Sequence, residues 1–309
     1  MITRKAVVTG GAGFIGSHLA EALSEKNYRV TIIDDLSSGK LKNIEPFQDK
    51  VQFVKATITD LASLEKLFQG SDYVFHLAAI ASVQKSIDDP KTSNEVNLTG
   101  TLNVLLAAAH NKVKKVIFVS SAAVYGDSPV APKREDMVPC PLSPYAVGKL
   151  AGENYCRVLG QIYHLPTVSL RCFNVYGPRQ DPTSQYASVI SKFITSIMAG
   201  KPPVIFGNGE QTRDFVFVKD VVNANILAAE SDACGRFNIS SGKNVTMNEL
   251  AKIIMKLLGR ELKPVHREAR QGDIKYSLAD ISKAATFGYE PHYSLKNGLG
   301  ETLKWYKAR

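Results

Sequence analysis

The fold is decided by one stretch near the start of the chain, which reads Ala6-Val7-Val8-Thr9-Gly10-Gly11-Ala12-Gly13-Phe14-Ile15-Gly16. An apolar run leads into spaced glycines and then into an amphipathic segment, which predicts a strand, a tight turn and a helix. We expect Gly10 to permit the turn, Gly13 to admit a pyrophosphate and Gly16 to let the helix pack closely on the sheet. The amide groups at the helix N-terminus would then face the anion. The stretch therefore predicts a dinucleotide site.

An acid at the end of the second predicted strand supports this interpretation. The next apolar run, Val30-Thr31-Ile32-Ile33, ends at Asp34, about 20 residues further on, where a carboxylate can accept hydrogen bonds from the adenosine ribose. Asp34 and Asp35 together would repel a 2'-phosphate. We therefore expect NAD rather than NADP as the cofactor.

A second motif, Pro144-Tyr145-Ala146-Val147-Gly148-Lys149, carries the candidate chemistry. Tyr145 and Lys149 stand at i and i+4, on one face of a predicted helix for which Ser143 suits the N-cap and Pro144 the first position. A nearby cation favours the phenolate and should lower the pKa of Tyr145, so that this residue can act as a base near neutral pH. An exposed helix face can show the same spacing, so the pair gains its meaning from the rest of the chain.

Short apolar runs alternate with amphipathic stretches, which is typical of an α/β doubly wound parallel sheet of the Rossmann type. The predicted strands are residues 4–9, 29–34, 51–54, 72–77, 115–121 and 167–172, and the predicted helices are 14–26, 60–69, 92–110 and 144–164. We expect an NAD-binding domain over residues 1–170. Proline and glycine punctuation after Arg171 predicts a smaller C-terminal α/β substrate domain over 171–309. Residues 214–238 resemble a strand, helix and strand that should return to the main sheet.

Composition agrees with an enzyme of small anionic substrates. The 309 residues are 44% hydrophobic, and 38 basic against 29 acidic residues give a net charge of +9. The basic residues are scattered, so we expect no nucleic-acid partner. The four cysteines and six histidines lack metal spacing, which predicts no metal and small buried cysteines in a reducing cytoplasm. A strand beginning almost at Met1 leaves no room for a signal peptide, and no segment suggests a membrane span.

With these motifs in order, the chain resembles the extended short-chain dehydrogenase/reductase superfamily and, within it, the nucleotide-sugar epimerases. The resemblance covers essentially the whole length. Beyond the motifs above it rests on His76-Leu77-Ala78-Ala79, Asn97, Ser120-Ser121-Ala122-Ala123-Val124-Tyr125-Gly126, Arg171-Cys172-Phe173-Asn174, Gly207-Asn208-Gly209-Glu210-Gln211-Thr212-Arg213-Asp214 and Arg270-Gln271-Gly272-Asp273. It implies an isomerase that inverts C4 of a UDP-hexose through a 4-keto intermediate. UDP-glucose and UDP-galactose are the expected substrates, with their N-acetylated forms as further candidates.

The resemblance also implies roles for single residues. Tyr145 would remove the proton of the sugar 4-hydroxyl while hydride passes from C4 to NAD, Lys149 would hold the nicotinamide ribose and lower the tyrosine pKa, and Ser121 would hydrogen-bond the same sugar oxygen. The implied cofactor residues are Gly10, Gly13, Phe14, Ile15, Asp34, Leu77, Ala78, Ala79, Asn97, Ser120, Tyr145, Lys149 and Cys172.

On the substrate side the resemblance implies that Arg213 and Arg270 grip the diphosphate, a role that suits the guanidinium fork. Phe206 would lie beside the uracil and Asp273 would bind the uridine ribose, although Phe206 also fits an ordinary core position and Asp273 a turn. The full implied set is Ser82, Ser121, Tyr145, Asn174, Val189, Phe206, Arg213, Arg270, Asp273 and Ser277, and Ser82, Lys85 and Ser86 are expected in a loop over the nicotinamide.

Three positions depart from related sequences. Ala122 and Ala123 follow Ser121 where related dehydratases carry an acid–base pair, and an alanine cannot transfer a proton, so elimination of water is not expected. Ala56-Thr57-Ile58 replaces a family Gly-Asp-Ile, which puts one adenine contact in doubt. Ser277 stands where some relatives have a tyrosine, so the pocket should admit an N-acetyl group unless a neighbour such as Tyr276 fills the gap.

Two other functions remain open from the sequence. A net oxidoreductase acting on a nucleotide sugar would share the fold and the Tyr145–Lys149 pair, but it would exchange its cofactor in each cycle. A non-catalytic NAD-sensing protein would need no base, so the intact Ser121, Tyr145 and Lys149 argue against it. The resemblance further implies a homodimer in which helices 92–110 and 144–164 pair with their copies as a four-helix bundle.

Overall fold

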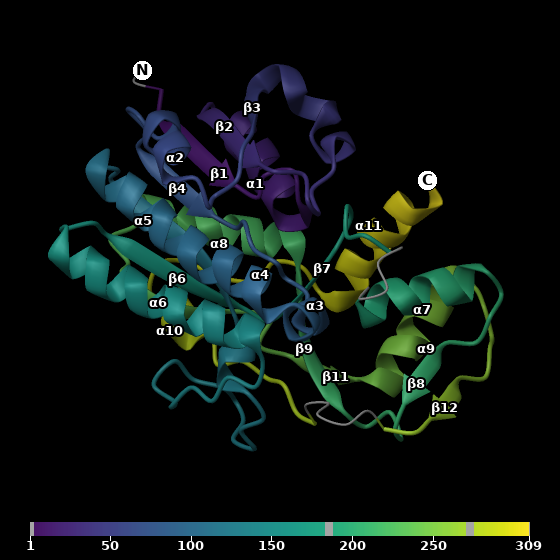
Figure 1. Cartoon of the computed structure of the whole chain (residues 1–309). Coiled ribbons are helices and arrows are strands. Elements are labelled where there is room, and N and C mark those ends of the chain that lie inside the picture. Colours follow the sequence, from purple (N-terminus) through teal and green to yellow (C-terminus); the bar gives the residue numbers. More distant parts are fainter. Residues whose placement is uncertain (1–2, 183–187, 270–274, 309) are drawn as a thin grey trace.

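The computed structural model describes residues 3–182, 188–269 and 275–308 (Figure 1). Within these residues the large sheet is built from β1 (Lys5–Thr9), β2 (Arg29–Asp34), β3 (Val51–Lys55), β4 (Tyr73–His76), β5 (Lys115–Ser121), β6 (Thr167–Cys172) and β10 (Gly235–Ile239). The strands are all parallel and lie in the order β10-β6-β5-β4-β1-β2-β3. The order reverses between β1 and β4, and ligands of such sheets bind at the carboxyl ends of the strands beside that point.

Helices cover both faces of the large sheet (Figure 1). On one face lie α1 (Phe14–Glu25) and α8 (Val218–Glu230), where Leu19 and Val221 pack in one buried cluster with Ile32. On the other face lie α2 (Leu61–Leu67), α5 (Gly100–His110) and α6 (Pro144–Ile162), where Leu64 and Val104 pack with Val7. Strands buried on both faces are expected to be mainly apolar, as the centre of β5 with Val116, Ile117, Phe118 and Val119 is. The doubly wound parallel sheet predicted from the sequence is confirmed.

The remaining elements form a smaller α/β part. Its strands are β7 (Asn174–Tyr176), β9 (Thr212–Phe217) and β11 (Asn244–Thr246), which pair as β11-β9-β7, and β8 (Val204–Phe206), which pairs with β12 (Val265–Arg267). Its helices are α7 (Val189–Met198), α9 (Met247–Leu258) and α11 (Leu295–Lys307), while α10 (Ser282–Ala285) packs against β10. Phe193, Leu250 and Leu299 lie in a separate buried cluster of this part.

The stretch 214–238 is shared between the two parts rather than returning whole to the large sheet. Its first strand, β9, pairs with β7 and β11 because Phe215 and Phe217 pack with Tyr176 in the smaller core. Helix α8 and strand β10 do join the larger part, and β10 forms the edge of the large sheet beside β6.

The predicted bounds agree with the structure to within about two residues, with two exceptions. Residues 92–110 are not one α-helix, because α4 (Pro90–Asn94) runs into a π-helical segment, Glu95–Thr99, before α5 begins. Residues 83–88 form helix α3 (Val83–Asp88) where a loop was expected, and the Ser82 hydroxyl caps it by accepting from the Lys85 amide at 3.1 Å. Short 3-10 turns occur at Leu41–Asn43, Glu45–Lys50 and Ala122–Tyr125.

Burial of the cysteines differs in part from the prediction. Cys156 and Cys172 are buried, but Cys140 and Cys234 are exposed. Both exposed thiols lie outside the regular elements, in segments that the core does not cover. None of the helices in the described ranges is long and apolar enough to cross a bilayer.

Candidate active site

A cavity of about 540 Å³ opens at the carboxyl ends of β1, β2, β4, β5 and β6, beside the reversal of strand order. This volume is typical of sites for small molecules. Its wall contains the following residues predicted from the sequence: Gly10, Gly13, Phe14, Ile15, Asp34, Leu77, Ala78, Ala79, Ser82, Ser120, Ser121, Tyr145, Lys149 and Cys172. Residues far apart in the chain therefore meet in one site.

The glycine turn forms one side of the cavity and leaves no room for side chains. Gly10 has φ +71°, and a Cβ there would lie 2.7 Å from the Ala78 amide nitrogen. A Cβ on Gly16 would lie 2.1 Å from the Gly10 carbonyl oxygen. Helix α1 begins after Gly13, which offers no side-chain cap, so the first-turn amides stay available to an anion at the helix N-terminus. This turn fits a pyrophosphate.

Asp34 lies at the end of β2 and is 7% exposed. Its carboxylate accepts from the Ala12 amide at 3.0 Å and from the Leu36 amide at 2.9 Å, while burial raises its pKa. A carboxylate has about four acceptor positions, so two are left for ribose hydroxyls. Asp35 lines the same cavity, and the two acids disfavour a 2'-phosphate there. The residues present therefore fit NAD.

The adenine side departs from the family pattern in the way the sequence indicated. Ala56, Thr57 and Ile58 all line the cavity. The Thr57 hydroxyl lies 2.9 Å from the Thr59 hydroxyl, within hydrogen-bond distance. This threonine thus supplies hydroxyl and backbone groups, and no carboxylate, to that side of the site.

Helix α6 begins where Tyr145 is needed. The Ser143 hydroxyl accepts from the Ala146 amide at 3.2 Å and Pro144 occupies the first turn, which confirms the predicted cap. The Tyr145 amide donates to the Ser86 hydroxyl at 3.1 Å, so α3 fixes the same helix start from outside. Both bonds limit how far the phenol can move.

Burial governs the charges of Tyr145 and Lys149. Lys149 is 4% exposed and its Nζ donates to the Val119 carbonyl at 2.7 Å, 5.9 Å from the centre of the Tyr145 ring. Burial lowers the pKa of Lys149 to about 8. Burial also raises the pKa of Tyr145 to about 12, opposed by a hydrogen bond with Ser121. The predicted lowering of the tyrosine pKa is therefore wrong for the protein alone, because desolvation outweighs the hydrogen bond with Ser121.

A buried ion pair supports the wall behind Ser120. The Ser120 hydroxyl donates to Glu153 Oε1 at 2.6 Å, and Arg171 donates to both oxygens of Glu153 at 2.9 Å and 2.7 Å. The side chains of Arg171 and Glu153 are completely buried. We did not predict Glu153 from the sequence, although it lies four residues after Lys149 on the same helix face.

Asn97 contacts the cavity wall through Ile80. It is not among the residues that line the cavity; its side-chain oxygen accepts from the Ile80 amide at 2.8 Å and its nitrogen donates to the Ile80 carbonyl at 3.1 Å, and its cofactor contact stays a prediction. Ile80 does line the cavity. Asn97 lies in the π-helical segment, and such segments are frequent at functional sites.

The substrate residues are only partly assembled by this cavity. Ser82, Ser121 and Tyr145 line it, whereas Asn174, Val189, Phe206, Arg213 and Ser277 do not. Those five lie in β7, α7, β8, β9 and the segment after residue 274. Arg270 and Asp273 fall outside the described residues.

Other wall residues carried no motif. They are Ile80, Ala81, Val96, Val119 and Val175, together with Ser37 and Ser38; Lys85 and Phe173, both named in the sequence analysis, also line the cavity. Most of them contribute apolar surface or backbone groups, which many residue types can supply. From the sequence they could be predicted only by their position near the ends of the predicted strands. Within the described ranges no group of three or more His, Cys, Asp or Glu residues could hold a metal ion.

Known proteins are similar to this chain in both sequence and fold. The model of the NAD dependent epimerase/dehydratase family matches residues 6–240. UDP-glucose 4-epimerase of Mycolicibacterium smegmatis is 40% identical over 312 residues, which covers 99% of each chain.

Two solved structures are similar throughout. UDP-N-acetylglucosamine 4-epimerase from Methanobrevibacter ruminantium, in complex with UDP-N-acetylmuramic acid, has a TM-score of 0.96 and 46% identity, covering 100% of this chain and 99% of that one. UDP-glucose 4-epimerase from Thermus thermophilus, in complex with NAD, has a TM-score of 0.89 and 35% identity, covering 98% and 99%. With the glycine turn and Asp34 in one cavity, these matches show that the chain belongs to the NAD dependent epimerase/dehydratase family, whose cofactor is NAD.

Proposed function

We propose that this chain is an NAD-dependent epimerase that inverts C4 of a UDP-hexose through a 4-keto intermediate. One observation carries the proposal: Ser121, Tyr145 and Lys149 line the same cavity as the glycine turn and Asp34. The names of the relatives support it, since each of those described above is a UDP-sugar 4-epimerase.

The residues divide the chemistry as follows. When bound, NAD supplies the hydride acceptor for C4 and, in its oxidised form, a cation that favours the phenolate. Tyr145 takes the proton of the 4-hydroxyl and Ser121 donates a hydrogen bond to the same oxygen. Lys149 holds the nicotinamide ribose. Once the 4-keto sugar has turned over, Tyr145 would give the proton back to the 4-oxygen, and the bound cofactor would supply the hydride for the other face of C4 and so not be consumed.

The residues after Ser121 separate this reaction from loss of water. The methyl side chains of Ala122 and Ala123 cannot donate or accept a proton. Ala122 starts a 3-10 turn that continues to Tyr125. Elimination across C5 and C6 therefore has no acid–base pair at this position. A net oxidoreductase remains the second candidate, distinguished by exchange of its cofactor in each cycle.

The substrate side is proposed from the resemblance. Arg213 and Arg270 would bind the diphosphate, Asn174 would lie near it, and Phe206 and Asp273 would hold the uridine. Val189 and Ser82 complete the proposed set, and Ser277 would leave room for an N-acetyl group. The name of the 46% identical structure, a UDP-N-acetylglucosamine 4-epimerase, supports this wider substrate range.

We also propose a homodimer formed through α5 and α6. The two helices pack side by side on one face of the large sheet (Figure 1). Val147 and Ile162 on α6 are 51% and 62% exposed, so this surface has apolar side chains that a second copy could cover. The cytoplasmic location expected from the sequence stays a prediction.

The proposal is tested by supplying UDP-glucose, UDP-galactose and their N-acetylated forms to the purified protein without added cofactor and resolving the products. Interconversion of C4 epimers is expected, with NAD or NADH, and little NADP, recovered from the protein by mass spectrometry. Accumulation of a keto or dehydrated sugar, or activity only with added cofactor, would overturn it.

A further inference from the structure

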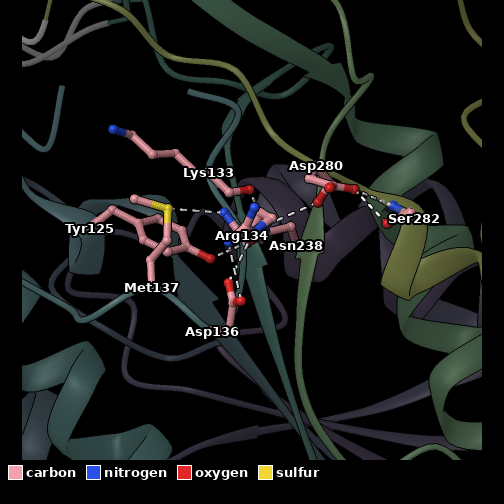
Figure 2. Close-up of polar contacts among 8 residues, drawn as sticks. All are labelled: Tyr125, Lys133, Arg134, Asp136, Met137, Asn238, Asp280 and Ser282. Carbon is pink, nitrogen blue, oxygen red and sulfur yellow. Dashed lines mark hydrogen bonds and ion pairs between the residues drawn. The ribbon is translucent and has the colours of Figure 1, made fainter. Parts of the chain in front are cut away.

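Asn238 is completely buried in edge strand β10 and joins three segments of the chain. Its side-chain oxygen accepts from the Tyr125 hydroxyl at 2.7 Å, and its side-chain nitrogen donates to the Lys133 carbonyl at 2.9 Å and the Asp280 carbonyl at 3.1 Å. Figure 2 shows Asn238 between these residues. Because both carbonyls can only accept, the orientation of the amide is fixed.

The first of these segments leads to the proposed catalytic residues. Tyr125 ends the 3-10 turn that starts directly after Ser121. Its ring lies 4.7 Å from the Arg171 guanidinium, and Arg171 is the residue that Asn238 faces across the β6–β10 pairing. Arg171 in turn holds Glu153, which accepts from Ser120. A continuous set of buried polar contacts thus runs from Asn238 to the cavity wall.

The second and third segments meet on the substrate side. The Lys133 amide donates to the Leu278 carbonyl at 2.8 Å and the Asp280 amide donates to the Lys133 carbonyl at 2.9 Å. From the other side the Ala279 amide donates to the buried Asp214 carboxylate at 3.0 Å, one residue after Arg213. Residues 278–280 are therefore held between the loop around Lys133 and strand β9, directly after Ser277.

We propose that Asn238 is a positioning residue that fixes the segment carrying Ser277 relative to the turn after Ser121. The inference rests on the proposed function, in which Ser277 borders the sugar and Ser121 contacts its 4-oxygen. Asn238 touches neither group and acts through Tyr125 on one side and through the Lys133 and Asp280 carbonyls on the other. A shift of either segment would change the distance between the sugar wall and the reacting oxygen.

Three variants separate the two sides of this contact. Asn238→Leu has a similar branched shape and makes none of the side-chain hydrogen bonds, so KM for UDP-glucose and UDP-N-acetylglucosamine is expected to rise about tenfold while retained NAD is unchanged. Asn238→Asp keeps an acceptor for Tyr125 but offers at most one hydrogen to the two carbonyls, and it should also raise KM. Tyr125→Phe keeps the ring over Arg171 and should lower kcat about threefold.

A double-mutant cycle tests the coupling. In an Asn238→Leu background the added Tyr125→Phe change should have a clearly smaller effect on kcat, because the hydroxyl has already lost its bond with the Asn238 amide. Asn225→Leu is the matched control: this buried asparagine in α8 donates to Val221 in its own helix at 2.8 Å, and its loss should lower Tm without changing KM.

Two results would overturn the inference. One is that both Asn238 variants lower Tm as Asn225→Leu does but keep the parent's KM and kcat. The other is that Tyr125→Phe has the same effect in both backgrounds. If Asn238→Leu does not fold, Asn238→Asp and Tyr125→Phe decide in the same way. A parent protein that fails to epimerise either sugar refutes the proposed function, whereas an active parent with unaffected variants refutes this inference alone.

Discussion

At the scale of single residues, burial has opposite effects on the two ends of the Tyr145–Lys149 pair. Desolvation favours the protonated phenol of Tyr145, which is half-buried at the cavity wall, and the neutral amine of the buried Lys149, so the pKa moves to about 12 for Tyr145 and about 8 for Lys149. Without the cofactor, the protein therefore favours a neutral Tyr145 and a neutral Lys149 between about pH 8 and pH 12. In the proposed mechanism, Tyr145 would act as a base at neutral pH only with the positive charge of oxidised NAD nearby.

Tyr145→Phe tests the base directly. The variant should keep its fold and its bound NAD, while turnover falls at least about a hundredfold, the scale for loss of a general base. Steady-state kinetics and the absorbance of extracted cofactor measure both effects. Tyr163→Phe, a tyrosine that is 44% exposed just after α6, should retain the parent's turnover. Near-parental turnover of Tyr145→Phe would remove this residue from the mechanism.

Ser277→Tyr tests the proposed sugar wall. A phenol ring in place of a hydroxymethyl group should lower kcat/KM for UDP-N-acetylglucosamine at least about tenfold relative to UDP-glucose, since pocket contacts of this size discriminate on that scale. Tyr276→Ala is the companion variant. If the 47% exposed Tyr276 filled the gap, its removal would change the same ratio, and we expect no change. An unchanged ratio in Ser277→Tyr would contradict the assignment.

At the scale of elements, the turn between β1 and α1 depends on contacts between backbone atoms. A Cβ on Gly16 would lie 2.1 Å from the Gly10 carbonyl oxygen, closer than any packing allows. Gly10 itself has a φ that L side chains rarely adopt. The pyrophosphate site is thus formed by close approach of chain segments, which only glycine permits.

Gly16→Ala should separate α1 from this turn. The variant should no longer retain NAD, and its free energy of unfolding should fall by about 1–3 kcal/mol, the range for overpacking. Gly300→Ala in α11 is the matched control: its new Cβ would meet no atom within 4 Å, so the helix should gain up to about 1 kcal/mol. Denaturant unfolding and cofactor extraction compare the two. Equal behaviour of the variants would show that the turn tolerates a side chain.

Whether a feature could be predicted from the sequence depended on the kind of contact that it involves. The glycine turn, Asp34 and the Ser143 cap each require a particular residue type at a fixed place, so they could be predicted. The bonds of the buried Asn97 to Ile80 could not, because they depend on a π-helical segment with no residue signature. The Tyr145 pKa could not either, since it depends on how much solvent the folded chain excludes.

At the scale of the whole molecule, His76 links the large sheet to a covering helix. Its ring nitrogens lie 2.8 Å from the Thr9 hydroxyl and 2.9 Å from the Thr101 hydroxyl, and it is 1% exposed. Burial lowers its pKa to about 3. Between that value and about 6.5 the unfolded chain binds a proton that the folded chain does not, so stability is lost as pH falls through this window.

The free energy of unfolding should therefore decrease by about 1.5 kcal/mol between pH 6.5 and pH 5 through His76 alone. Urea unfolding at several pH values measures the slope. His76→Gln should reduce the slope, whereas His266→Gln, an exposed histidine, should leave it unchanged. If His76→Gln leaves the slope unchanged, the proton that the chain takes up on unfolding binds to another group.

The proposed dimer is tested at the same scale. Light scattering should give twice the chain mass over a wide concentration range, because the exposed Val147 and Ile162 of α6 are apolar side chains that a second copy could cover. Ile162→Glu should yield monomers. Val138→Glu, at an 86% exposed valine in the loop after β5, should leave the dimer intact. A parent that stays monomeric at all concentrations would rule out this assembly.

The late position of α8 and β10 in the chain limits how the protein can be divided or synthesised. Val221, Ala224 and Ile226 of α8 cover the same sheet face as Leu19 and Ile32, yet they are encoded after the first strands of the smaller part. A fragment ending at Arg171 would leave that apolar face open to water and would be prone to aggregate. On the ribosome, too, the cofactor-binding sheet stays incomplete until the chain has passed residue 239.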